Sequence, residues 1–209
     1  MEAKYPQIRP KSMNRQGILI YSYKDIPLAQ TDDGSQARFL RNNARACHPK
    51  EFGLKLYYGK WEAICAYERQ KLAAKEGLAP PVGRLIQVHK DNKIKFWGYQ
   101  TCLAIRLDPD FPMYQRLFPN EETIWKGPAA LRRALRKLDI STLPCNDLFH
   151  ETSDPDNPPV TGHKNWGLGG DLHDFNVMVW EDTPVCIDFG YHSVLTSKRG
   201  RISQVNRIP

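Results

Sequence analysis

Alternating apolar and polar positions dominate the first half of the chain and predict short β-strands. Five such runs cover residues 17–23, 37–41, 52–58, 84–89 and 94–99. Their spacing, with turn residues between most of them, predicts a small antiparallel sheet.

A helical period replaces this alternation over residues 61–75. The side chains that recur on one face, and that we expect to be buried, are Trp61, Ile64, Cys65 and Leu72. Glu68 lies four residues before Leu72 and therefore shares this face, whereas Glu62 lies off it. A carboxylate on an apolar face is costly unless it is paired, so we expect a cation opposite Glu68.

The second half is expected to be mainly helical. Residues 128–138 form a helix in which Leu131 and Leu135 belong to the buried face, while the basic residues between 132 and 137 face solvent. Residues 108–119 and 150–170 are rich in proline, glycine and aspartate, so both are expected to be loops.

A β-hairpin is predicted near the end of the chain. Residues 177–180 and 185–187 are apolar strands, and residues 181–184 form the turn between them. Asn176 immediately precedes the first strand and Asp188 follows the second, so antiparallel pairing brings their side chains together.

These two side chains and Asp171, on the loop before the hairpin, are oxygen donors of the kind that Mg²⁺ prefers. A further carboxylate at such a site can also orient or deprotonate an attacking hydroxyl. Taken singly, each of the three residues is equally typical of a turn, where Asp and Asn bond to the local backbone.

Composition narrows the classes of protein. The 209 residues carry a net charge of +7, which favours anionic partners such as phosphates but is equally typical of a solvated basic surface. The five cysteines are widely spaced, so we expect neither a disulfide framework nor a zinc site. No apolar run approaches the ~18 residues that span a bilayer, and the N-terminus lacks the pattern of a secretory signal, which favours a cytoplasmic protein.

The sequence GDLHDFN at residues 170–176, followed by IDFG at 187–190, resembles the catalytic and metal-binding motifs of the protein-kinase-like superfamily. It is most similar to the aminoglycoside-phosphotransferase and RIO-like branches, whose pattern is H-G-D-L-H-x-x-N and then I-D-F-G. The resemblance implies that Asp171 is the catalytic aspartate and that Asn176 and Asp188 bind Mg²⁺.

The same resemblance assigns roles in the first half. Lys55, in the strand EFGLKLY, would hold the phosphates of ATP, and Glu68 would orient this lysine. Gly34 and Ser35 occupy the position of the phosphate-binding loop, although only one of its usual three glycines is present. ATP would bind near residues 98–104.

Two departures from the family pattern affect this interpretation. Gly169 replaces the histidine that begins the motif, and only 19 residues follow Gly190 in the 209-residue chain. We therefore expect a minimal kinase of the kind found in bacterial effectors and phages, acting in the cytoplasm or delivered into that of a host. Alternatively, a partner protein completes the second lobe.

The sequence thus predicts an α+β, two-lobed kinase-like fold. Residues 1–104 form the N-lobe, a small antiparallel sheet with one helix, and residues 105–209 form a reduced helical C-lobe that carries the hairpin. The expected activity is transfer of the γ-phosphoryl group of ATP to a hydroxyl of a protein or a small molecule. Two alternatives remain: a pseudokinase that only binds a partner protein, and a nucleic-acid-binding protein, which the net charge and residues 132–137 suggest but which we rank lowest.

Overall fold

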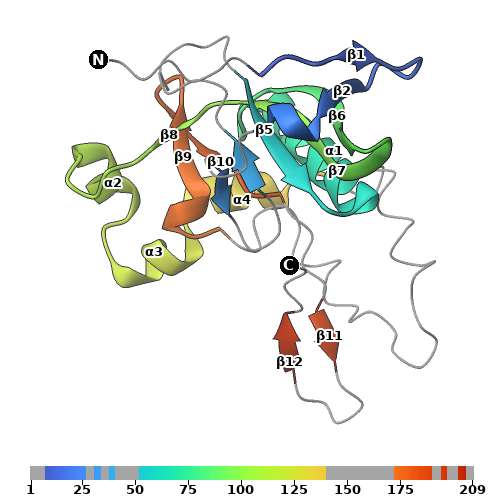
Figure 1. Ribbon diagram of the computed structural model, residues 1–209. Helices are drawn as coiled ribbons and strands as arrows, with labels where there is room; N and C mark the ends of the chain where they lie inside the picture. Colours follow the sequence, from blue (N-terminus) through green and yellow to red (C-terminus); the bar gives the residue numbers. More distant parts are fainter. Residues whose placement is uncertain are drawn as a thin grey trace.

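The protein is α+β, with a large mixed sheet, a smaller sheet and few helices (Figure 1). The computed structural model describes residues 8–26, 31–33, 38–40, 52–139, 172–189, 194–196 and 202–205. None of the helices in these ranges is long and apolar enough to cross a membrane.

The large sheet contains seven strands in the order β1-β2-β6-β7-β5-β4-β3. Their bounds are Ser12–Met13 (β1), Leu19–Ser22 (β2), Thr31–Asp33 (β3), Arg38–Leu40 (β4), Phe52–Tyr57 (β5), Val82–Lys90 (β6) and Lys93–Cys102 (β7). The five predicted runs correspond to β2, β4, β5, β6 and β7. A short 3-10 helix, η1 (Tyr23–Asp25), follows β2.

The prediction of an antiparallel sheet is wrong at one place, because β2 pairs with β6 in parallel, with Leu19 opposite Ile86. All other neighbouring strands in this sheet are antiparallel. Parallel neighbours need a long crossover connection. Here that connection contains β3, β4, β5 and the first helix, so local pattern alone could not reveal the pairing.

Helix α1 (Lys60–Lys75) lies against one face of this sheet, and its extent agrees with the prediction. The predicted buried face is right only in part: Cys65 is buried, but most of the buried side chains of α1 lie at other positions. The side chains that are fully or almost fully buried across α1 include Ala63, Ala66, Gln70 and Ala73, whereas Ile64 and Leu72 are only half-buried. The small side chains of Ala63 and Ala66 let the helix approach the large rings of Tyr57 and Tyr99 on the sheet, with which they form one core cluster.

The opposite face of the sheet is covered by the N-terminal segment. Leu54 and Leu56 of β5 point to this side, because side chains alternate along a strand, and they pack with Ile8, Tyr21 and Ile26. Consequently Lys55 and Tyr57, the residues in alternate positions of β5, point to the α1 side.

The second half of the chain contains short helices and a three-stranded sheet of order β10-β9-β8. The bounds are Ile105–Arg106 (β8), Pro112–Leu117 (α2), Glu121–Lys126 (α3), Ala129–Arg136 (α4), Val177–Trp180 (β9) and Thr183–Cys186 (β10). The predicted loop at 108–119 is wrong in part, because α2 lies within it. Pro112 occupies the first helical turn, where proline is favourable.

The α4 helix agrees with the prediction: Leu131 and Leu135 are buried, while Arg133 and Arg136 are exposed. Its leucines belong to a core cluster that also contains Ala73, near the end of α1, and Ala79, in the turn that follows this helix. The two halves of the chain therefore share a core at this point.

The predicted hairpin is confirmed, with Cys186 opposite Val177 in the β9–β10 pair. Its turn is shorter than expected. Glu181 and Asp182 alone form it, both with positive φ, as in the tight turns that suit a hairpin. Pro184 is already part of β10, where it is tolerated because β10 is an edge strand. Two further strands, β11 (Val194–Thr196) and β12 (Ile202–Val205), form a separate ribbon.

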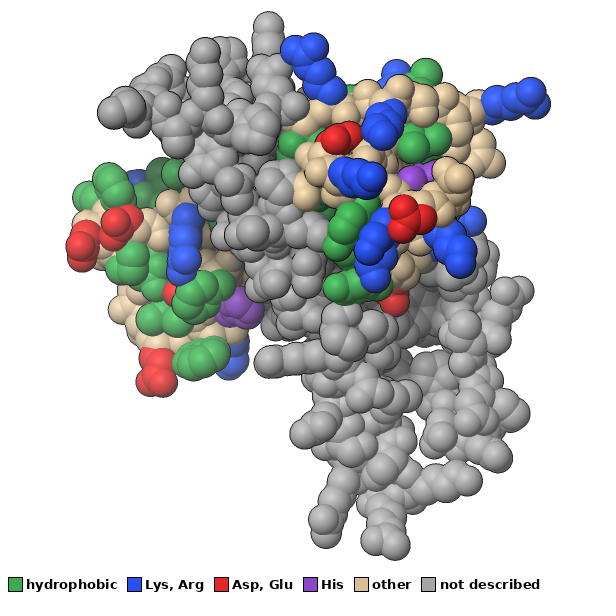
Figure 2. All heavy atoms as spheres, in the orientation of Figure 1, with side chains coloured by type: hydrophobic (Ala, Val, Ile, Leu, Met, Phe, Trp, Pro, Cys, Tyr) green, Lys and Arg blue, Asp and Glu red, His purple; other side chains and the backbone are tan. Residues whose placement is uncertain are grey.

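The surface differs between the two halves (Figure 2). Lys and Arg side chains gather over the part that contains β1, β2, β6 and β7, whereas the part with α2 and α3 shows hydrophobic side chains among scattered acidic and basic ones. The exposed large hydrophobic residues of the second part include Phe111, Trp125 and Phe175.

Candidate active site

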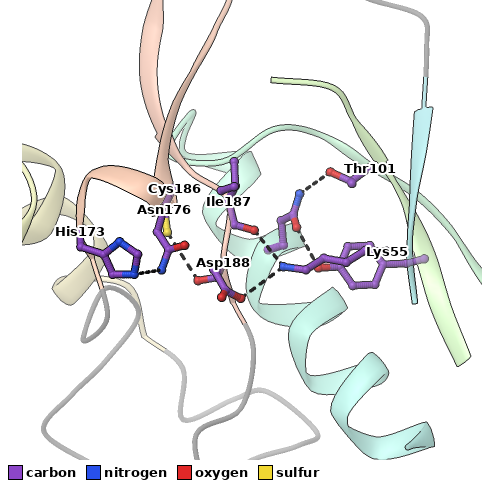
Figure 3. Close-up of polar contacts among 9 residues, drawn as sticks. Lys55, Thr101, His173, Asn176, Cys186, Ile187 and Asp188 are labelled. Atoms are coloured by element: carbon purple, nitrogen blue, oxygen red, sulfur yellow. Dashed lines mark hydrogen bonds and ion pairs between the residues drawn. The ribbon is translucent and has the colours of Figure 1, made fainter. Parts of the chain in front are cut away.

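Lys55 meets the open end of the β9–β10 hairpin, although the two are far apart in sequence (Figure 3). Its Nζ lies 3.3 Å from Oδ1 of Asp188 and donates to the carbonyl oxygen of Ile187 at 3.1 Å. The Lys55 side chain is 12% exposed and that of Asp188 is 32% exposed. The site therefore contains a partly desolvated ion pair that connects the large sheet to the hairpin.

Asn176 stands at the same end of the hairpin, in the short 3-10 helix η5 (Asp174–Asn176). Its carbonyl oxygen accepts from the Ile187 N–H at 3.0 Å, which continues the strand pairing by one step. Its side-chain Nδ2 lies 3.0 Å from Nε2 of His173. Because an amide nitrogen only donates, His173 Nε2 accepts this bond, and the amide oxygen of Asn176 is directed away from the imidazole.

Neighbouring elements hold η5 in place. The Tyr114 hydroxyl, from α2, donates to a carboxylate oxygen of Asp174 at 2.9 Å, and the Arg106 guanidinium lies 4.8 Å from the centre of the Phe175 ring. Thus Asp174 and Phe175, the two residues between His173 and Asn176, are both contacted by side chains from other elements.

Leu172, the first described residue of the motif, is buried against Gly127 at the end of α3. A Cβ at Gly127 would overlap the Leu172 side chain, and the positive φ of 68° at Gly127 also favours glycine. The approach of the chain to the motif therefore depends on a glycine that carries no chemistry.

The electrostatics of the site are dominated by burial and by the ion pair. Burial acts to lower the pKa of Lys55, but the attraction of Asp188, together with smaller contributions that include Tyr99, outweighs burial and raises the pKa above 10.5. Burial raises the pKa of Tyr99, and it raises that of Tyr57 well above 10.0. At neutral pH the site therefore holds a charged lysine beside two protonated tyrosines.

Of the predicted site residues, Lys55, Asn176 and Asp188 are brought together. Asp171, Gly34 and Ser35 lie outside the described residues. Glu68 does not meet Lys55: its carboxylate pairs with Lys71, one turn along the same helix, at 3.8 Å. The predicted pairing fails because Glu68 lies on a different face of α1 from the buried alanines.

Glu62, which ranked second for this role, is on the alanine side of α1, since it lies four residues before Ala66. Its carboxylate folds back over Gly59, and Oε2 is buried without a hydrogen-bond partner among the described residues. Its charge also contributes to the raised pKa of Tyr57. Glu62, rather than Glu68, is therefore the α1 carboxylate that acts on a residue beside Lys55.

Sequence reasoning did not identify Tyr57 and Tyr99, which share the α1 face of the sheet with Lys55, or Gln70, which bonds to the Tyr99 hydroxyl. Tyr57 was accessible to such reasoning, because it is two residues from Lys55 and must share its face. Tyr99 and Gln70 were not, because they depend on strand register and on helix orientation.

The oxygens of Asn176 and Asp188 are a donor set that suits Mg²⁺, which commonly binds through one or two protein ligands with the rest supplied by phosphates and water. The Lys55 ammonium beside Asp188 opposes a bare cation but favours one that arrives with polyphosphate. The residues thus fit a metal–nucleotide complex better than a metal alone.

No family model matches the chain, and no curated protein and no solved structure match it.

Proposed function

We propose that this protein is an ATP- and Mg²⁺-dependent phosphotransferase, a minimal kinase with a kinase-like two-lobed arrangement. The observation that carries the proposal is the convergence of Lys55 with Asp188 and Asn176. These residues come from two distant segments, and their charges suit a nucleotide triphosphate with its metal.

Each residue of the site has a defined role in this proposal. Lys55 would bind phosphate oxygens, and Asn176 and Asp188 would hold Mg²⁺, which neutralises charge on the phosphates. Asp171 would orient or deprotonate the acceptor hydroxyl. The acceptor is a protein or a small molecule, and a partner protein would complete the second lobe if the chain alone is inactive.

Lys55 would then need a second anionic neighbour once Asp188 binds the metal. Glu62 is the best candidate, since its carboxylate has a buried oxygen without a partner among the described residues. Buried carboxylates are costly when unpaired. We expect Glu62→Gln to reduce transfer at least tenfold, whereas Glu68→Gln, which removes only a half-exposed pair with Lys71, changes it less than twofold. A larger loss in Glu68→Gln would reverse this assignment.

The test is an assay of label transfer and ATP turnover with Mg²⁺, in which wild type is compared with Asp188→Asn. The substitution keeps the shape of the side chain but removes the charge that attracts metal and lysine. The matched control is Asp182→Asn, in the exposed turn of the same hairpin, where asparagine tolerates the positive φ of 60°. We expect turnover in wild type and control and none in Asp188→Asn. Full activity of Asp188→Asn would rule out the metal assignment.

One observation favours a second candidate, a protein-binding module without phosphoryl transfer. Lys55 is bonded to the same carboxylate that would hold the metal, so it competes with the cation for Asp188. In a pseudokinase this ion pair would be a permanent part of the structure. A melting temperature that does not change when nucleotide is added, together with no ATP turnover, would support this alternative.

A further inference from the structure

Gln70 is a buried amide in the interface between α1 and the large sheet, and it is only 1% exposed. Its Nε2 donates to the Thr101 hydroxyl at 2.6 Å and to the Pro80 carbonyl oxygen at 3.0 Å. Its Oε1 accepts from the Tyr99 hydroxyl at 2.9 Å. Both N–H groups and the oxygen of the amide are therefore used, as buried polar groups require.

One of these partners leads directly to the site. Tyr99 of β7 is the cross-strand partner of Lys55 of β5, so the two side chains are immediate neighbours on the α1 face. The Tyr99 ring is fully buried and stacks with the Tyr57 ring, with centroids 6.2 Å apart. The Lys55 stem thus lies beside a ring whose hydroxyl end is fixed by Gln70.

Thr101, whose hydroxyl also bonds to Gln70, is not next to Lys55. Thr101 is the cross-strand partner of Gly53, which has no side chain and is two residues from Lys55. The hydroxyls of Tyr99 and Thr101 therefore bond to the same amide, while only Tyr99 is next to the lysine.

We propose that Gln70 is a positioning residue for Lys55: by accepting the Tyr99 hydroxyl, it fixes the ring beside Lys55 and so holds the ammonium at Ile187 and Asp188. A long lysine side chain loses much rotamer freedom when it is ordered. A fixed ring beside the aliphatic part of the lysine reduces the number of rotamers that the side chain can adopt. Less conformational entropy is then lost when the ammonium binds phosphates. This functional consequence rests on the proposed phosphotransferase activity.

The choice of glutamine is specific. A glutamate could accept from Tyr99 but would have no donor for Thr101 and Pro80, and its charge would be buried. The neutral amide also adds no negative charge beside Lys55.

The two arms of the network provide a matched pair of variants. Tyr99→Phe and Thr101→Val each remove one buried hydroxyl that bonds to Gln70, with little change of shape. We expect both to lower the midpoint of urea unfolding, and both are assayed at temperatures where they remain folded. Only Tyr99→Phe is expected to raise the KM for Mg·ATP, about three- to tenfold, with kcat changed less than twofold. Equal effects of the two variants on KM, or none from Tyr99→Phe, would overturn the positioning role.

A second measurement needs no nucleotide. The ¹⁵N NMR signal of a lysine ammonium is observed when hydrogen bonds slow its proton exchange, and the Lys55 signal is identified by its loss in Lys55→Arg. We expect it in wild type and Thr101→Val, and we expect it to broaden in Tyr99→Phe. An unchanged signal in Tyr99→Phe would refute the positioning role. A wild type that neither binds nor turns over Mg·ATP would refute the proposed function instead, and the ammonium signal would still decide the role of Gln70.

Discussion

The ion pair between Lys55 and Asp188 allows a quantitative prediction about stability. At 3.3 Å the Coulomb attraction is about 5 kcal/mol for an effective dielectric constant of ~20. Desolvation offsets most of this, and the 32% exposure of the Asp188 side chain admits solvent screening. We therefore expect a coupling free energy of about 1–2 kcal/mol between the two side chains.

The assay is a double-mutant cycle of urea unfolding with Lys55→Met, Asp188→Asn, the double variant and wild type. Each single variant should lose more free energy of unfolding than the coupling energy alone, because it leaves the other, partly buried member of the pair without its partner. The double variant should be more stable than the sum of the single losses predicts. A coupling energy within ~0.3 kcal/mol of zero would refute the ion pair as a stabilising contact.

The pH dependence of the same cycle gives an independent check. Although burial lowers the pKa of Lys55, Asp188 outweighs it and raises the folded pKa above 10.5. The folded state therefore binds this proton more tightly than the unfolded chain does. The stabilisation is complete below pH 10.5 and is lost as the pH rises through the folded pKa. Comparison with Lys55→Met separates this loss from the loss caused by titration of the tyrosines. If the stability difference between wild type and Lys55→Met stayed constant as the pH rose above 10.5, the pKa of Lys55 would not be raised by folding.

Two glycines give further predictions. Gly98→Ala should cost about 3 kcal/mol or more in urea unfolding, because its Cβ would overlap the Lys55 carbonyl oxygen and force β5 and β7 apart; a loss below 1 kcal/mol would show that the strands yield easily. Gly127→Ala should cost about 2–4 kcal/mol, because it combines a positive φ with overlap on Leu172. In that variant, transfer activity should fall more than stability alone explains, and normal activity per folded molecule would show that the motif does not depend on this contact.

Local pattern in the sequence determined most of the elements. The hairpin at 177–187, α1, α4 and the main strands follow from apolar period and turn residues, and their extents agree with the structure within a few residues. The sequence also predicts that Asn176 lies beside the end of β10, because the short turn of the hairpin fixes the register of its two antiparallel strands.

The convergence of Lys55 on Asp188 could be expected from the sequence only through the family resemblance. Nothing in local pattern relates residues 133 positions apart. The parallel pairing of β2 with β6 was likewise inaccessible, because it depends on the path of a long connection.

The orientation of α1 was decided by tertiary packing alone. Both large and small apolar residues recur along this helix, so the sequence allowed a face of large residues with Glu68 or a face of alanines with Glu62 and Gln70. Ala63 and Ala66 pack against the rings of Tyr57 and Tyr99 on the sheet. Close packing against those rings therefore selected the alanine face, and with it the polar groups that surround Lys55.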